Sequence, residues 1–200
     1  DKVHAADWNK YFGFSKAQSG QYDTRKPTED EMESQKLFAV MQMTYVGAPM
    51  IYYGDEVSMW GANDPDCRKP MVWEDLVYEA EATLPDGTKK ARPDKVAVNR
   101  GLFDHYRRLI ALRNEHEALR VGSFETLMTD DARAIYAFRR KSGADEVVVV
   151  LNNSREPREV ALPLDGSWRD RWNTRQPVSD EAGQLSVTLP ARGAAILVKQ

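Results

Sequence analysis

Four charged residues in one short stretch have the types and the spacing to act on a polar ligand: Asp55, Glu56, Asp64 and Arg68. They follow an apolar and aromatic run, Pro49 to Tyr53, whose composition is typical of a strand buried on both faces. A buried strand that ends in a loop of carboxylates, amides and an arginine is a common way to present polar groups to a ligand. The chemistry to consider is therefore acid–base catalysis by carboxylates, or hydrogen bonding to a bound ligand.

The adjacent pair Asp55 and Glu56 has the wrong geometry for joint catalysis. Neighbouring side chains at the end of a strand point to opposite faces, so the two carboxylates would not face one ligand. Buried carboxylates are usually paired with hydrogen-bond donors. We therefore expect both side chains to hydrogen-bond the loop or neighbouring residues.

Asp64 and Arg68 are the better candidates for contact with a ligand. They flank the turn Pro65-Asp66-Cys67, which would bring a carboxylate and a guanidinium to one side of the loop. Such groups form bidentate hydrogen bonds. The alternative is an ion pair that only stabilises the loop, and the residues alone leave both interpretations open. Trp60 and Trp73, at the ends of the loop, are expected to be buried rather than stacked on a ligand.

A resemblance to a known family rests on two segments, Gly47-Ala48-Pro49-Met50-Ile51-Tyr52-Tyr53-Gly54-Asp55-Glu56 and Asn63-Asp64-Pro65-Asp66-Cys67-Arg68-Lys69-Pro70-Met71-Val72-Trp73. They resemble the last barrel strand and following loop of the α-amylase family, glycoside hydrolase family 13, in particular its neopullulanase and cyclomaltodextrinase branch. The resemblance implies that Asp64 and Arg68 bind glucose units of a starch-derived oligosaccharide next to the cleaved bond. It also implies that the catalytic carboxylates lie on earlier barrel strands, so no catalytic residue is expected in this chain. Hydrolysis, glycosyl transfer and isomerisation are not separated by it.

Composition excludes several other classes. The chain has 200 residues, 42% of them hydrophobic, and a formal net charge of −3, which suits one or two domains and offers no basic surface for nucleic acid. No apolar run approaches the roughly 20 residues that span a bilayer. The first residues do not have the pattern of a signal peptide, and the compartment stays open. The three histidines and Cys67 have no metal-ligand spacing, so neither a metal nor a cofactor is expected.

The elements around the loop follow from capping and periodicity. Thr28 with Glu31 has the spacing of a capping box, and the helix that starts there is apolar nearly all round from Leu37 to Val46. Gly47 suits the end of that helix. Residues 74–98 are rich in charged side chains and predict a surface hairpin. A second helix is expected from about 99 to 115. Its apolar stripe comprises Leu102, Phe103, Tyr106, Leu109, Ile110 and Arg113.

From Leu119 onward the pattern changes to strands and turns. Segments of alternating or continuous apolar residues are separated by Gly, Pro and Asn at the spacing of an antiparallel sandwich; they centre on residues 134–139, 147–151, 160–164, 185–189 and 194–198. The predicted fold class is therefore α/β followed by all-β. Residues 1–116 would be the final helix, strand and helix of a (β/α)₈ barrel, and residues 117–200 an antiparallel β-sandwich domain.

A complete (β/α)₈ barrel needs about 250 residues. We therefore expect the chain to be the C-terminal part of a longer enzyme, to be inactive alone, and to need the rest of the barrel or to self-associate. Two other functions remain. A glycan-binding module would need an aromatic platform, for which Trp168 and Trp172 are the indole candidates of the β domain. A non-catalytic interaction role is the other.

Overall fold

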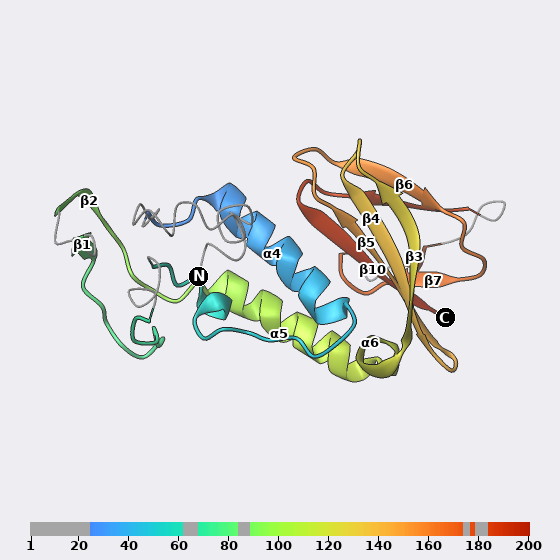
Figure 1. Cartoon of the computed structure of the whole chain (residues 1–200), viewed down its shortest axis with the longest axis horizontal. Coiled ribbons are helices and arrows are strands. Elements are labelled where there is room, and N and C mark those ends of the chain that lie inside the picture. The colour runs from blue at the N-terminus through green and yellow to red at the C-terminus, as the bar shows by residue number, and fades with distance from the viewer. Residues whose placement is uncertain (1–24, 62–67, 84–88, 174–176, 179–183) are drawn as a thin grey trace. The chain divides into compact units, whose positions relative to one another are not determined.

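The computed structural model describes residues 25–61, 68–83, 89–173, 177–178 and 184–200 (Figure 1). The chain divides into two compact units. The first consists of residues 1–36 with 50–107, and the second of residues 37–49 with 108–200. No helix among the described residues has the length and apolar character needed to cross a membrane.

Helix α4, Glu29–Thr44, begins at the predicted capping box. The Glu31 backbone N–H donates to Thr28 Oγ1 at 3.3 Å, and the Thr28 N–H donates back to the Glu31 carboxylate at 2.7 Å. A hydrogen bond from Arg25, with a smaller contribution from Thr28, outweighs burial and lowers the pKa of Glu31 to about 2. The second half of the helix is largely covered, and Ala39, Val40 and Met43 are almost fully buried. Both features confirm the sequence prediction.

Helix α5, Arg100–Glu115, is capped by Asn99, whose Oδ1 accepts the Leu102 N–H at 3.1 Å. The expected stripe is buried at Leu102, Tyr106 and Leu109. Ile110, which we placed on the stripe, is instead 39% exposed, while Leu112 is buried. Leu112 lies three positions beyond Leu109, so the buried face continues through it and leaves Ile110 at the edge.

The predicted surface hairpin is present. Strands β1, Glu81–Thr83, and β2, Lys89–Asp94, pair in antiparallel fashion, with Glu81 opposite Asp94 (Figure 1). Its turn, residues 84–88, lies outside the described residues.

The strand expected at Pro49 to Tyr53 is not formed, and this prediction is wrong. The segment has no strand assignment, and Met50 is 74% exposed, with Tyr52 and Tyr53 also on the surface. A parallel strand exists only through hydrogen bonds to neighbouring strands, and no sheet of the described residues includes this segment.

The second unit contains the antiparallel β structure that the alternation predicted. After a short helix α6, Glu117–Val121, come β3 (Ser123–Asp130), β4 (Ile135–Ser142), β5 (Asp145–Asn152), β6 (Arg158–Leu162), β7 (Trp168–Asp170), β8 (Pro177–Val178), β9 (Leu185–Leu189) and β10 (Gly193–Lys199). Strands β3-β4-β5-β10-β7-β8 form one sheet, and β6 pairs with β9 in another. We expected only strands and turns from Leu119, and helix α6 corrects the start of that region.

The two sheets pack through one apolar core. Val148 and Leu197 of the larger sheet and Val160, Leu162 and Leu185 of the smaller one belong to the same buried cluster. Because successive strand residues alternate between faces, these residues form the inner faces of a sandwich. The predicted β-sandwich is therefore confirmed.

His116 and Asp145 tie helix α6 to the start of β5. Asp145 Oδ1 lies 2.9 Å from His116 Nδ1, and Asp145 Oδ2 accepts the Ala118 N–H at 2.9 Å. Burial alone would raise the pKa of the Asp145 carboxyl, but the bonds from Ala118, His116 and Glu117 hold it below its ordinary value. Asp145 therefore caps α6 as a carboxylate.

Asp145→Asn is expected to lower the free energy of unfolding at neutral pH by about 1–2 kcal/mol. Folding lowers this pKa, so the ionised group stabilises the fold above its unfolded-state pKa of about 3.9. That contribution is lost as the pH falls through the folded-state pKa. Urea unfolding at a series of pH values should show that the difference in free energy of unfolding between the original chain and the variant disappears in acid. Asp131→Asn, an exposed turn residue, is the control. A difference that persists in acid would contradict this assignment.

Candidate functional site

A tight turn follows Tyr53 and opens the predicted loop. Gly54 has a φ of 93°, and a Cβ at this position would lie 2.5 Å from Met59 Sδ, so only glycine fits. The Asp55 N–H donates to the Tyr52 carbonyl at 3.1 Å, and a 3₁₀ turn, Asp55–Val57, follows. The chain therefore reverses its direction at this point and does not continue as a strand.

Asp55 and Glu56 take part in this turn. Glu56 Oε2 accepts the Gly54 N–H at 3.0 Å, and the Asp55 carbonyl accepts the side-chain amide of the buried Gln35 at 2.9 Å. Burial, followed by the charges of Asp55 and Glu56, raises the pKa of the Tyr106 phenol well above its usual range. The expected loop-bonding role is thus confirmed for Glu56, while the predicted position at a strand end is wrong for both residues because they lie in a 3₁₀ turn.

Trp60 closes the first arm of the loop as a buried side chain with 6% exposure, as expected. Its indole Nε1–H donates to Glu81 Oε1 at 3.3 Å. The ammonium groups of Lys26 and Lys69 lie 5.2 and 5.4 Å from the indole ring, which suits a cation–π contact. Trp60 is therefore a structural anchor, and its ring is covered.

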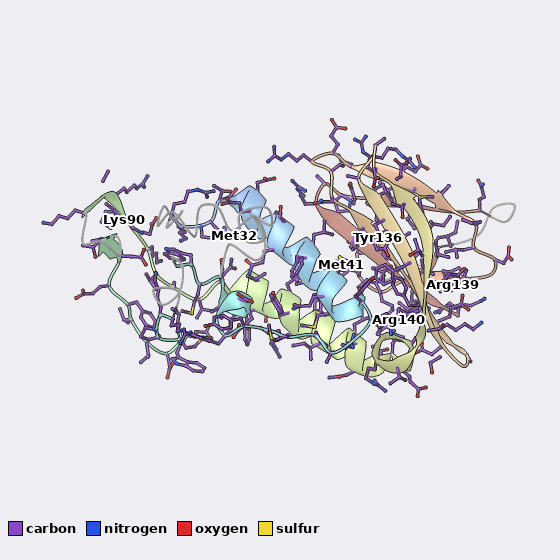
Figure 2. All side chains as sticks on the ribbon, in the orientation of Figure 1. Met32, Met41, Lys90, Tyr136, Arg139 and Arg140 are labelled. Carbon is purple, nitrogen blue, oxygen red and sulfur yellow. The ribbon has the colours of Figure 1, made fainter. Side chains whose placement is uncertain are left out.

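Lys69 anchors the other end of the loop. Its ammonium forms an ion pair with Glu81, and its backbone carbonyl accepts a hydrogen bond from Tyr53 Oη at 2.9 Å. Glu81 also binds Lys90, which in turn lies 2.9 Å from Asp94, and Figure 2 shows Lys90 on the β2 arm of the hairpin. One carboxylate of the hairpin thus receives groups from both ends of the loop.

Of the two predicted binding residues, Arg68 and Asp64, the structure describes only Arg68. Arg68 is exposed and directly precedes the anchored Lys69, whereas Asp64 lies outside the described residues. The structure therefore places Arg68 beside a fixed point of the loop. The relation between Asp64 and Arg68 stays a prediction.

The remaining tryptophans differ in exposure, and the sequence did not indicate which of them are buried. Trp73, expected to be buried, is 57% exposed, next to exposed Leu76 and Val77. This prediction is wrong, because the described residues do not cover the Trp73 side chain in the segment that follows the loop. Trp168 and Trp172 are buried, with 1% and 8% exposure, so neither offers an aromatic platform to a glycan.

Sequence reasoning missed Glu81 and its partners. It treated residues 74–98 only as a charged hairpin, and Glu81, Lys90 and Asp94 there have no motif. The one available signal is their position on the two arms of the predicted hairpin, where Glu81 and Asp94 face each other across the strands. In the described part of the chain, no three His, Cys, Asp or Glu side chains gather in a way that would hold a metal ion.

Two known protein families match successive parts of this chain. Residues 19–122 match the catalytic domain of the α-amylases, and residues 124–196 match the C-terminal domain of maltogenic amylases. The first match covers more than half of the chain. The chain therefore belongs to the α-amylase family of glycoside hydrolases, and it combines a part of the catalytic domain with a C-terminal β domain.

Individual relatives agree with this assignment. Neopullulanase 2 of Thermoactinomyces vulgaris is 40% identical over 77% of this chain, and a cyclomaltodextrinase of Geobacillus thermopakistaniensis is 36% identical over 79%. The solved α-amylase of Anoxybacillus matches 84% of this chain with a TM-score of 0.65 and 26% identity, over 32% of its own length. The chain spans only 23% and 24% of the two curated relatives, about a quarter of their length.

Proposed function

We propose that this chain is the C-terminal part of a retaining glycoside hydrolase that acts on α-glucosidic bonds of starch-derived oligosaccharides. The observation that carries the proposal is the order of the two family matches. A catalytic-domain match limited to residues 19–122 is followed by the C-terminal domain. A (β/α)₈ barrel takes about 250 residues, so most of a barrel would lie upstream of this segment.

The proposed contribution of this part is binding of the substrate, without catalysis. Asp64 and Arg68 would hold a glucose unit through bidentate hydrogen bonds. No catalytic carboxylate is assigned to this chain, which is supported by the engagement of Glu56 with the Gly54 N–H. A domain boundary near residue 117, dividing residues 1–116 from 117–200, is part of the proposal. It is supported by a first family match that ends at residue 122.

The proposed ligands are α-glucan oligosaccharides. Relatives at 36–40% identity include two cyclomaltodextrinases and a neopullulanase, whose names point to cyclic maltodextrins and pullulan. A glycan-binding module without catalysis is less well supported, because Trp168 and Trp172 are buried.

We further infer that the first unit is covered by additional protein. Met50, Trp73 and Val77 expose between 57% and 100% of their surface, and the apolar segment from Met50 to Tyr53 belongs to no sheet of the described residues. Such a segment gains stability when strands are added beside it. The upstream part of the barrel or, in its absence, a second copy of the chain would supply them.

The test compares two purified proteins: the 200-residue chain, and a longer chain in which the missing upstream part of the barrel is added before it. The corresponding upstream part of the Thermoactinomyces vulgaris neopullulanase barrel would be used, so that residues 1–116 complete the barrel. Reducing-sugar release from cyclomaltodextrin, pullulan and maltoheptaose is the measurement.

We expect no turnover by the short chain and turnover by the longer chain, since the carboxylates that retaining hydrolysis requires would lie upstream. The upstream part alone gives the background rate. Turnover by the short chain alone would contradict the proposal and would return Asp55, Glu56 and Asp64 to consideration as catalytic groups.

A further inference from the structure

The loop that carries Arg68 is tied at both ends to one side chain. Trp60, at its start, donates its indole N–H to Glu81 Oε1 at 3.3 Å, and Lys69, at its end, pairs with Glu81 Oε2. Glu81 belongs to strand β1, outside the loop. A carboxylate with two oxygens can accept from both partners at once, so it sets the separation between the two ends of the loop.

The surroundings of Glu81 make this junction stronger than an ordinary surface ion pair. Its side chain is only 20% exposed, and the side chain of its second cationic partner, Lys90, is 8% exposed. Burial acts to raise the pKa of Glu81, but the bonds from Lys69 and Lys90 hold it below its usual range. Glu81 is therefore ionised at neutral pH, and charge-assisted hydrogen bonds of this kind are the stronger class.

Lys69 transmits this constraint to its neighbour Arg68. Its ammonium is held by Glu81 and lies 5.4 Å from the ring of Trp60, while its carbonyl accepts the Tyr53 hydroxyl at 2.9 Å. The Lys69 side chain and backbone are thus both fixed. The Cα atoms of consecutive residues are about 3.8 Å apart, so a fixed Lys69 limits where the Arg68 backbone can lie.

We propose that Glu81 is a positioning residue, which holds the loop ends so that Arg68 is presented to the sugar in one orientation. The inference rests on the proposed function of Arg68 and deepens it. It also assigns a role to the hairpin β1–β2, which places a carboxylate in contact with a loop that lies earlier in the sequence. Positioning of this kind is effective because a small misplacement of a binding group costs much of its benefit.

The first experiment needs no sugar and uses the 200-residue chain. Hydrogen exchange of peptides that cover residues 61–70 is compared in the original chain, Glu81→Ala, Glu81→Gln and the control Glu79→Gln. Glu79 is an exposed carboxylate just before β1, so its replacement makes the same change in charge. We expect exchange to be about tenfold faster in Glu81→Ala and unchanged in the control. Glu81→Gln, which keeps an acceptor for Trp60, should fall between them.

The second experiment measures kcat and KM for maltoheptaose in the longer chain. Glu81→Ala and Glu81→Gln should raise KM by about tenfold and fivefold, with a smaller change in kcat. In an Arg68→Gln background the same substitutions should have almost no further effect, because Glu81 acts through Arg68. If Glu81 were only a structural residue, its replacement would reduce activity by the same factor in the original and in the Arg68→Gln background. If Glu81→Ala loses the hairpin, Glu81→Gln decides the question.

The two possible failures are distinguishable. Additive losses at Glu81 and Arg68, or unchanged loop exchange in Glu81→Ala, would overturn the positioning role and leave the function of Arg68 intact. An Arg68→Gln variant with unchanged KM and kcat would overturn the proposed function of Arg68, and the role of Glu81 with it.

Discussion

Replacing Arg140 by methionine is expected to lower the free energy of unfolding by about 3 kcal/mol or more. Its side chain is 1% exposed and lies at the end of β4 (Figure 2). Its guanidinium makes five hydrogen bonds, all to backbone carbonyls, namely those of Thr44, Tyr45, Leu119, Gly122 and Ser123. Methionine fills much of the same volume but would leave these acceptors without a donor, and each unsatisfied buried acceptor costs about 1–3 kcal/mol.

Urea unfolding followed by tryptophan fluorescence would measure this loss. Arg133→Met is the control, since Arg133 is exposed in the β3–β4 turn and its ion pair with Asp130 lies on the surface, where such pairs contribute little to stability. If both variants lost the same small amount, the carbonyl contacts of Arg140 would not stabilise this unit.

Arg140 and Arg113 both donate hydrogen bonds to carbonyls at the end of helix α4. That helix has no basic residue in its last turn, and the carbonyls at a helix end lack backbone N–H partners within the helix. Arg113 of α5 donates to the Met43 carbonyl at 2.8 Å and the Gly47 carbonyl at 2.6 Å. Burial lowers the pKa of both arginines; Arg120 adds to the effect at Arg113, and Arg113 at Arg140. Two cations from distant positions therefore cap one helix end.

The sequence contained the caps and the periods but could not reveal these long-range partners. Thr28 and Glu31 are close in sequence, and the strands from Ile135 onward alternate regularly, so local patterns predicted both correctly. Arg140, by contrast, stands in the run Arg139-Arg140-Lys141, which looks like a solvated surface. Only its contact with the carbonyl of Thr44 at the end of α4, 96 residues earlier in the chain, shows that it is buried.

The candidate site shows the same limit. The apolar character of Pro49 to Tyr53 predicted a buried strand, but a strand needs neighbours, and the described residues supply none. The loop ends were recognisable from their composition. Their common partner Glu81 was not, because no local motif connects a loop residue to a carboxylate on the arm of a later hairpin.

Arg68 is where a binding role and a structural role make opposite predictions. In the longer chain, Arg68→Lys is expected to lower kcat/KM for maltoheptaose by about 100-fold. A planar guanidinium binds two oxygens at once, and an ammonium does not reproduce that geometry. If Arg68 only formed an ion pair within the loop, lysine would keep the charge, and activity would hardly change.

Steady-state kinetics of three variants would separate these roles. Asp64→Asn should produce a loss similar to that of Arg68→Lys, because both groups are proposed to hold the same sugar. Arg92→Lys, an exposed change of the same type on the hairpin, should leave kcat/KM within about twofold. Unfolding measurements complete the distinction, since the loss of an ion pair that only stabilises the loop would lower the free energy of unfolding and leave KM unchanged. Full activity of Arg68→Lys would mean that the resemblance of this loop to the family does not extend to its sugar-binding arginine.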